Sequence, residues 1–170
     1  AAPPAQAAPP APPAPSPPAA GKPSLGAHAL SFHGLHEAAQ SLSVPGLSTQ
    51  SSGSTMLVCV GRGQLDVDAP PSDSAGNVYT QLGAPHQYTL FPVSGTVLYG
   101  CAQARGMNGQ AVAVPKPNIG DEVTLTVVEV VNGGVIRDVQ WTEVPAGQPL
   151  TSASVTTTGP ALLVAWWWGD

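Results

Sequence analysis

The chain has 170 residues and a formal net charge of −5, and only 9% of its residues are charged, against about 25% in ordinary soluble domains. Nucleic-acid binding needs clustered positive charge, and the five basic residues are scattered: Lys22, Arg62, Arg105, Lys116 and Arg137. Nucleic acid is therefore not expected as a partner. A charge-poor surface is common in secreted β proteins and in proteins whose surface is buried in an assembly.

No apolar run approaches the roughly 18 residues of a membrane span, so we expect no membrane-spanning segment. The chain begins Ala-Ala-Pro-Pro without a methionine. A mature end left by cleavage behind small residues has this appearance, and so does the boundary of an expressed fragment.

Residues 1–23 form a Pro/Ala-rich tail that holds ten of the 20 prolines. Each proline fixes φ and removes a backbone donor, which excludes helix and sheet. We expect polyproline II, which rises about 3.1 Å per residue and would let the tail reach roughly 60–70 Å. Two interpretations stay open: a spacer, glycosylated or bare, and an extended strand that docks on a neighbouring subunit.

From residue 27 onward, strand-forming runs are separated by turn residues about every 8–12 positions. About eleven short strands are predicted, at 27–34, 40–44, 54–62, 78–82, 87–91, 96–103, 110–114, 121–131, 135–144, 151–158 and 161–168. Residues 66–76 are predicted to be a loop, and no helix of useful length is predicted. Residues 24–170 are therefore expected to form an all-β domain, an antiparallel β-sandwich of the immunoglobulin-like or jelly-roll kind.

The longest strand-forming run is 121–131, D-E-V-T-L-T-V-V-E-V-V, which contains no Gly or Pro. Apolar residues alternate with threonines in its first half, as on the two faces of a strand. The sequence Asn-Gly-Gly at 132–134 supplies turn chemistry, and the next strand-like run begins at 135. The pattern predicts a β-hairpin with one buried face, which other strands must cover.

Two further features concern turn and cysteine chemistry. Asp73 starts a predicted tight turn in which Gly76 and Asn77 tolerate positive φ. Cys59 and Cys101 each lie mid-way along a predicted strand. They are either plain small hydrophobes or, in an oxidising compartment, a disulfide between two strands. The spacing is similar to that of an immunoglobulin bridge, but no Trp follows shortly after Cys59.

Four local patterns occur in order: D-S-A-G-N-V-Y at 73–79, S-G-T-V-L-Y-G at 94–100, T-V-V-E-V-V-N-G at 126–133 and S-A-S-V-T-T-T-G-P-A-L-L-V-A at 152–165. They resemble β-sandwich modules of large secreted or surface-attached bacterial proteins and of some phage structural proteins. Those modules carry a D-x-x-G-N-x-Y turn, an E-[VY]-x-G strand end and a closing T-T-x-x-x-[DA]-L-[LV]-V strand.

The resemblance covers roughly residues 27–168 and implies a β-sandwich, with no catalytic residue to carry over. Modules of this kind usually continue for further strands beyond the last pattern. The resemblance therefore implies a sandwich that is incomplete at its C-terminal end. Either the chain ends early, or a partner strand fills the open edge.

Trp166, Trp167 and Trp168 are the most unusual feature of the sequence. On a strand, Trp166 and Trp168 share one face with Leu162 and Val164, and this face is expected to be core. Trp167 lies on the other face. An indole offers a flat apolar surface and an N–H donor, so Trp167 is a candidate for a protein interface or for stacking on a sugar.

Two groups of residues have side chains that can bind metals: the first is His28, His33, His36 and Glu37, and the second is Asp66, Asp68 and Asp73. Zinc needs ligands that converge on one point, which alternating strand positions do not predict. The aspartate spacing does not match a calcium loop. No metal and no cofactor is expected.

Glu129 interrupts an apolar face, at a bulge or near the rim of the core. A buried carboxylate with a raised pKa can act as an acid, but hydrolysis of sugars usually needs a second carboxylate facing it, and the sequence places none. No nucleophile elbow, Walker loop or dinucleotide motif is present, so an enzyme is not expected.

These features predict a non-enzymatic structural or assembly module that is secreted, on the cell surface or in a virion. Its expected partners are copies of itself or other subunits of an assembly. The alternative is a carbohydrate-binding module that binds glycans through the tryptophan strand.

Overall fold

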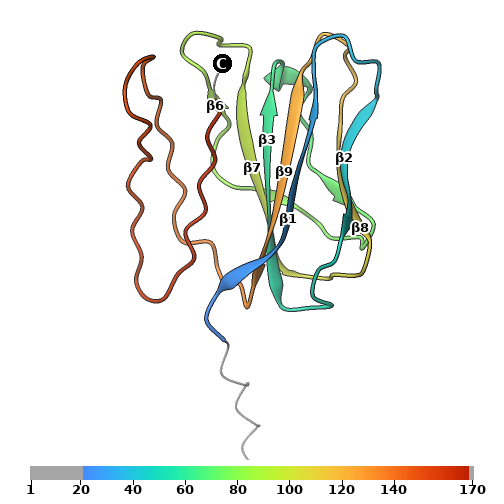
Figure 1. The fold of residues 1–170 in the computed structure, drawn as a ribbon, viewed down its shortest axis with the longest axis vertical. Coiled ribbons are helices and arrows are strands. Elements are labelled where there is room, and N and C mark those ends of the chain that lie inside the picture. The colour runs from blue at the N-terminus through green and yellow to red at the C-terminus, as the bar shows by residue number, and fades with distance from the viewer. Residues whose placement is uncertain (1–20, 169–170) are drawn as a thin grey trace, which may run out of the picture.

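The computed structural model describes residues 21–168, so most of the predicted proline-rich tail lies outside the described residues. The described chain is an antiparallel β-sandwich, which confirms the predicted fold class. One sheet has six strands and the other has three. Figure 1 shows β2 and β8 on one side of the larger sheet and the chain after β9 on its opposite side.

The strands are β1 (Ser24–His33), β2 (Ser41–Leu47), β3 (Ser54–Arg62), β4 (Ser72–Asp73), β5 (Thr80–Gln81), β6 (His86–Gln87), β7 (Gly95–Ala104), β8 (Gln110–Pro115) and β9 (Val123–Val131). One 3-10 turn, η1, covers Leu65–Val67. No helix in residues 21–168 is long and apolar enough to cross a membrane.

The larger sheet has the order β1-β9-β3-β7-β5, with β6 also paired to β7, and the smaller sheet has the order β2-β8-β4. Alternation along the strands fixes which face is buried. In β3, Met56, Val58 and Val60 point into the space between the sheets, where Val44 and Val112 meet them from the smaller sheet. Each such side chain contributes roughly 1.5–3 kcal/mol through burial, so the core lies between the two sheets.

The predicted strand at 121–131 forms β9, but the predicted hairpin after it is wrong. β9 is hydrogen-bonded to β1 on one edge and to β3 on the other. No edge of β9 is left for residues 135–144. The chain turns at Asn132, which has a φ of 54°, and leaves the sheet.

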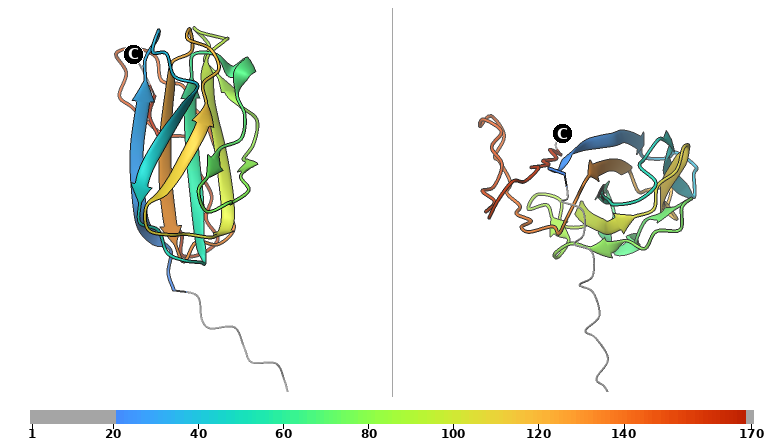
Figure 2. Two further views of the ribbon diagram at one scale, coloured as in Figure 1. Left: turned by 90° about the vertical axis from the view of Figure 1, so that its right-hand side faces the viewer. Right: turned by 90° about the horizontal axis from the view of Figure 1, so that it is seen from below.

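Other predicted strands are also absent or shorter. Residues 151–158 and 161–168 form no strand, 78–82 is reduced to β5 and 87–91 to β6. The view from below in Figure 2 shows the chain after β9 standing outside the two sheets. These segments have strand-like composition but no sheet edge to pair with.

The two cysteines are free, so the disulfide that the sequence left open is not formed. Both lie in the larger sheet, on the paired strands β3 and β7, where Cys59 is opposite Leu98 and Cys101 is opposite Met56. Because Met56 and Cys59 are an odd number of positions apart, they face opposite sides of the sheet. Cys59 therefore lies on the outer face and Cys101 on the inner face. Burial raises the pKa of the Cys59 thiol to about 12.

Candidate functional site

One end of the sandwich is held by a buried charge network around Arg62, which is 1% exposed. Its Nε lies 2.8 Å from Asp68 Oδ1, and its Nη1 lies 2.9 Å from Asp121 Oδ2. Its Nη2 donates to the carbonyl of Pro115, and the Tyr99 hydroxyl donates to Asp68. The network joins the ends of β3 and β8 and the middle of β7 to the chain entering β9.

The same end buries Lys116, whose Nζ donates to the carbonyl of Glu37 at 2.8 Å. Burial raises the pKa of Asp121, while the nearby Arg62 guanidinium acts in the opposite direction. Of the five basic residues, Arg62 and Lys116 are thus buried and bonded within the fold. The other three, Lys22, Arg105 and Arg137, are exposed. The buried charges hold separate loops of the chain together.

The turn predicted at Asp73 is built around its carboxylate. Oδ1 accepts the backbone N–H groups of Ala75 and Asn77, each at 3.0 Å. Oδ2 accepts the Asn77 amide at 2.7 Å, the Tyr79 hydroxyl at 2.8 Å and the Gln110 amide at 2.8 Å. Burial alone would raise the pKa of Asp73, but these hydrogen bonds outweigh it and lower the pKa.

The rest of the D-S-A-G-N-V-Y pattern has equally local reasons. Gly76 has a φ of 74°, a conformation that favours glycine. Asn77 Oδ1 accepts the N–H of Arg105 at 2.8 Å, and its amide donates to the Arg105 carbonyl at 2.8 Å. The pattern therefore encodes a structural clamp between the turn and the end of β7, and no reacting group.

Glu129 is 2% exposed and lies opposite a β-bulge in β1, where the register shifts between Leu25 and His28. A bulge leaves a backbone group without a ladder partner. Glu129 Oε2 accepts the N–H of Ala27 at 3.0 Å, and Oε1 accepts the N–H of Gln50 at 2.8 Å and the Ser54 hydroxyl at 2.6 Å. The carboxylate is engaged by these three donors, which supports a structural role.

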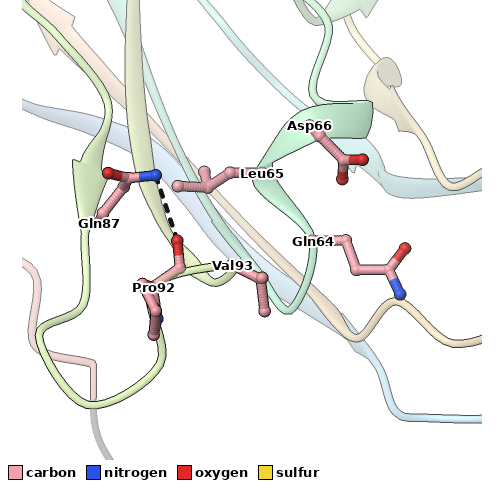
Figure 3. Close-up of a pocket in the computed structure, with 6 residues that line it drawn as sticks. All are labelled: Gln64, Leu65, Asp66, Gln87, Pro92 and Val93. Carbon is pink, nitrogen blue, oxygen red and sulfur yellow. Dashed lines mark hydrogen bonds between the residues drawn. The ribbon is translucent and has the colours of Figure 1, made fainter.

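The hollow in Figure 3 has a volume of about 490 Å³ and is lined by Gln64, Leu65, Asp66, Gln87, Pro92 and Val93. Gln87 Nε2 donates to the Pro92 carbonyl at 3.1 Å. The side chains of Gln64 and Asp66 point away from Leu65 and Gln87 (Figure 3). The polar groups that line this hollow therefore do not converge on one point.

The residues weighed as metal ligands are dispersed. His33 Nε2 lies 3.9 Å from Glu37 Oε2, and His28 Nδ1 lies 3.0 Å from the Gly26 carbonyl. Of the loop aspartates, Asp68 and Asp73 belong to two separate networks. Within residues 21–168, no group of three or more His, Cys, Asp or Glu side chains gathers at one point.

The remaining candidate is the outer face of the larger sheet. Leu57, Val128 and Val130 form a small apolar cluster there, against which other parts of the chain pack: Leu82, Ile136, Leu162, Val164 and Trp166. Trp168 lies over Gly61, where an added Cβ would fall on its ring. Trp167, on the opposite side of the segment, is 56% exposed.

A second contact holds the chain after β9. The Trp141 ring stacks on the His86 ring with centroids 5.4 Å apart, and Glu143 Oε1 lies 3.2 Å from His86 Nε2. Glu143 also accepts the N–H of Thr89 at 2.9 Å. Hydrogen bonds to Thr89 lower the pKa of Glu143.

The outer face is uncovered along β1. Leu30 is 63% exposed and Phe32 is 53% exposed, whereas Ala29 packs on the core from the other face of the strand. Neither residue carries charge, and Phe32 lies beside Thr124, which lies beside Gly61. The bare row on β1 is thus continuous with the site of Trp168.

Comparison of the chain with models of protein families, with curated proteins and with solved structures finds no match. The candidate functional site therefore rests on the geometry of this chain. Sequence reasoning selected the tryptophans but missed Leu30 and Phe32. The alternation within 27–34 could have revealed them. Ala27 and Ala29 form the face that packs on the core, so Leu30 and Phe32 form a second apolar face on the other side of the strand.

Proposed function

We propose that this domain is a non-enzymatic structural module of an extracellular, cell-surface or virion assembly, and that it associates with other chains through uncharged surface. The observation that carries the proposal is the apolar outer face of β1, with Leu30 and Phe32 more than half exposed. Exposed contiguous apolar surface marks interaction sites. The proline-rich tail acts as a spacer or as a docking segment.

The polar groups support the same proposal. Arg62, Asp73 and Glu129, the side chains with the most elaborate hydrogen bonding, bind other parts of the same chain. Because these three groups are already bonded within the chain, the exposed apolar face of β1 is the better candidate for recognition.

The test is the oligomeric state of the full chain and of a variant starting at Gly21, measured by light scattering and electron microscopy across a concentration series. We expect the full chain to form oligomers or filaments. If the shorter variant does not, the tail is a docking segment; if both assemble, the tail is a spacer. Monomers for both at high concentration would refute the proposal.

A carbohydrate-binding module remains the second candidate, because Trp167 is 56% exposed. Its test is a glycan array with the full chain and with Trp167→Ala. Binding that is lost in this variant would support it. An array without hits, or binding that survives the substitution, would remove it.

A further inference from the structure

Residues 161–168 have the side-chain pattern of a β-strand without a strand's hydrogen bonds. Leu162, Val164 and Trp166 turn toward the outer face of the larger sheet, while Leu163 and Trp167 are exposed. Within residues 21–168, no backbone–backbone hydrogen bond involves 161–168. Unpaired backbone N–H and C=O groups along an extended edge can pair with another strand, so this segment can accept a strand beside it.

The uncovered row on β1 lies on the same face. Phe32 is paired with Thr124, and Thr124 with Gly61, on which Trp168 lies. Neighbouring strands are about 4.8 Å apart, so Phe32 is roughly 10 Å from Gly61 across the sheet. A strand added to residues 161–168 on the side of β1 would lie over β9 and β1. It would cover Leu30 and Phe32.

We propose that the outer face of the larger sheet docks an extended β-strand from another polypeptide chain, which pairs with residues 161–168 and covers Leu30 and Phe32. This inference rests on the proposed assembly function and names one contact through which another subunit would join the assembly. Unpaired backbone groups select an extended chain, as in strand addition. Because Leu30 and Phe32 carry no charge, they favour an incoming strand that has apolar side chains at alternate positions.

The chemistry also narrows the source of the strand. A second folded copy cannot offer its own residues 161–168 for this position, because its own larger sheet lies against them. Residues 1–20 contain nine prolines, which lack the N–H groups that a ladder needs. We therefore assign the site to an extended, proline-poor segment of another polypeptide chain that is neither residues 1–20 nor residues 161–168 of a copy.

The probe is a fluorescent peptide of four Thr-Val repeats, acetylated at its N-terminus and titrated into the full chain. We expect saturable binding, and protection from hydrogen exchange at alternate amides of residues 161–168. Leu30→Ser with Phe32→Ser should weaken binding at least tenfold. The matched control is Leu90→Ser with Phe91→Ser, which removes the same two exposed side-chain types from a loop and should leave binding unchanged.

Successive residues of a strand direct their backbone groups to opposite edges. Val164→Pro and Ala165→Pro therefore remove donors from opposite edges, and we expect only one of the two to abolish binding. Thermal unfolding of each variant checks that the sandwich is intact. No binding to the unmodified chain, or equal loss from the β1 and loop double variants, would overturn the proposal.

The outcomes separate this inference from the proposed function. A chain that assembles without binding the peptide refutes the docking strand and keeps the assembly module. A chain that binds the peptide at this face but does not assemble supports the docking site and refutes assembly through copies of the chain.

Discussion

At the Arg62 end of the sandwich, charged side chains from three parts of the chain bond to one another, whereas residues 135–168 leave most of their backbone to solvent. Within the described chain, residues 135–168 take part in only one backbone–backbone hydrogen bond, which runs from the N–H of Gln148 to the carbonyl of Pro145. Both regions contain strand-forming sequence nearby. The difference shows that a segment forms a strand only if a sheet edge is free to pair with it, in addition to having a suitable sequence. Both edges of β9 are already paired, with β1 and with β3.

The largest expected effect comes from breaking the buried network. Arg62→Met should destabilise the protein by about 3–5 kcal/mol, because it leaves Asp68 and Asp121 buried without their cation. Urea unfolding followed by circular dichroism measures the change. Arg105→Met, at an exposed position, should stay within about 0.5 kcal/mol. If the free energy of unfolding of Arg62→Met fell by less than about 1 kcal/mol, Asp68 and Asp121 would not need the Arg62 guanidinium to remain buried.

Asp73→Asn should cost about 1–3 kcal/mol near neutral pH, because several donors lose a charged acceptor. The folded-state pKa of Asp73 is lowered, so its contribution is complete above the unfolded pKa of about 3.9 and is lost as pH falls through the lower folded value. The gap between the two proteins should therefore close in acid. Unfolding measured from pH 7 to pH 2 checks this, with Asp66→Asn as an exposed control. A gap that stays constant with pH would contradict the assignment.

Gly61→Ala tests how firmly the C-terminal segment, residues 161–168, packs on the larger sheet. The new Cβ would meet the Trp168 ring, which is partly exposed and can move outward. The cost should be about 1 kcal/mol, at the low end for overpacking, while tryptophan fluorescence shifts to the red and residues 135–168 become easier to cleave. Gly159→Ala, with open space around its Cβ, should change neither reading. Unchanged fluorescence in Gly61→Ala would place Trp168 elsewhere.

The smallest effect is expected at Glu143, which is exposed. Its pKa is lowered by hydrogen bonds to Thr89, so its link to Thr89 is present above the ordinary Glu pKa and weakens as pH falls through the lowered value. The protection factor of the Thr89 amide, which is its exchange rate relative to the intrinsic rate at the same pH, should therefore fall in acid. Glu143→Gln should show faster exchange already at neutral pH, and equal exchange in both proteins would argue against the link.

The sequence predicted the parts of the fold that depend on side-chain alternation and turn chemistry. The run 54–62 became β3 with the predicted limits, and Asp73, Gly76 and Asn77 formed the predicted turn. These features are local, because the residues that cause them lie within a few positions of one another. The order of the strands is not local, and nothing near 135–144 indicates that β1 occupies the edge of β9.

The candidate site was only half predictable for the same reason. The tryptophans are conspicuous in the sequence, and their alternation along 161–168 is present in the structure. That they lie on the face next to Leu30 and Phe32 follows from the pairing of β1 with β9. Residues about one hundred positions apart come together there, and the periodicity of either segment alone carries no sign of it.

That pairing also bears on biosynthesis. Among the described strands, β1 pairs only with β9, so on the ribosome β1 must wait for the last of these strands to be made. Long-range pairing of this kind slows folding, and domains are made from the N-terminus at about 5–20 residues per second. For several seconds, Leu30 and Phe32 would be displayed on an unpaired strand. The larger sheet therefore cannot be completed during synthesis until β9 has been made.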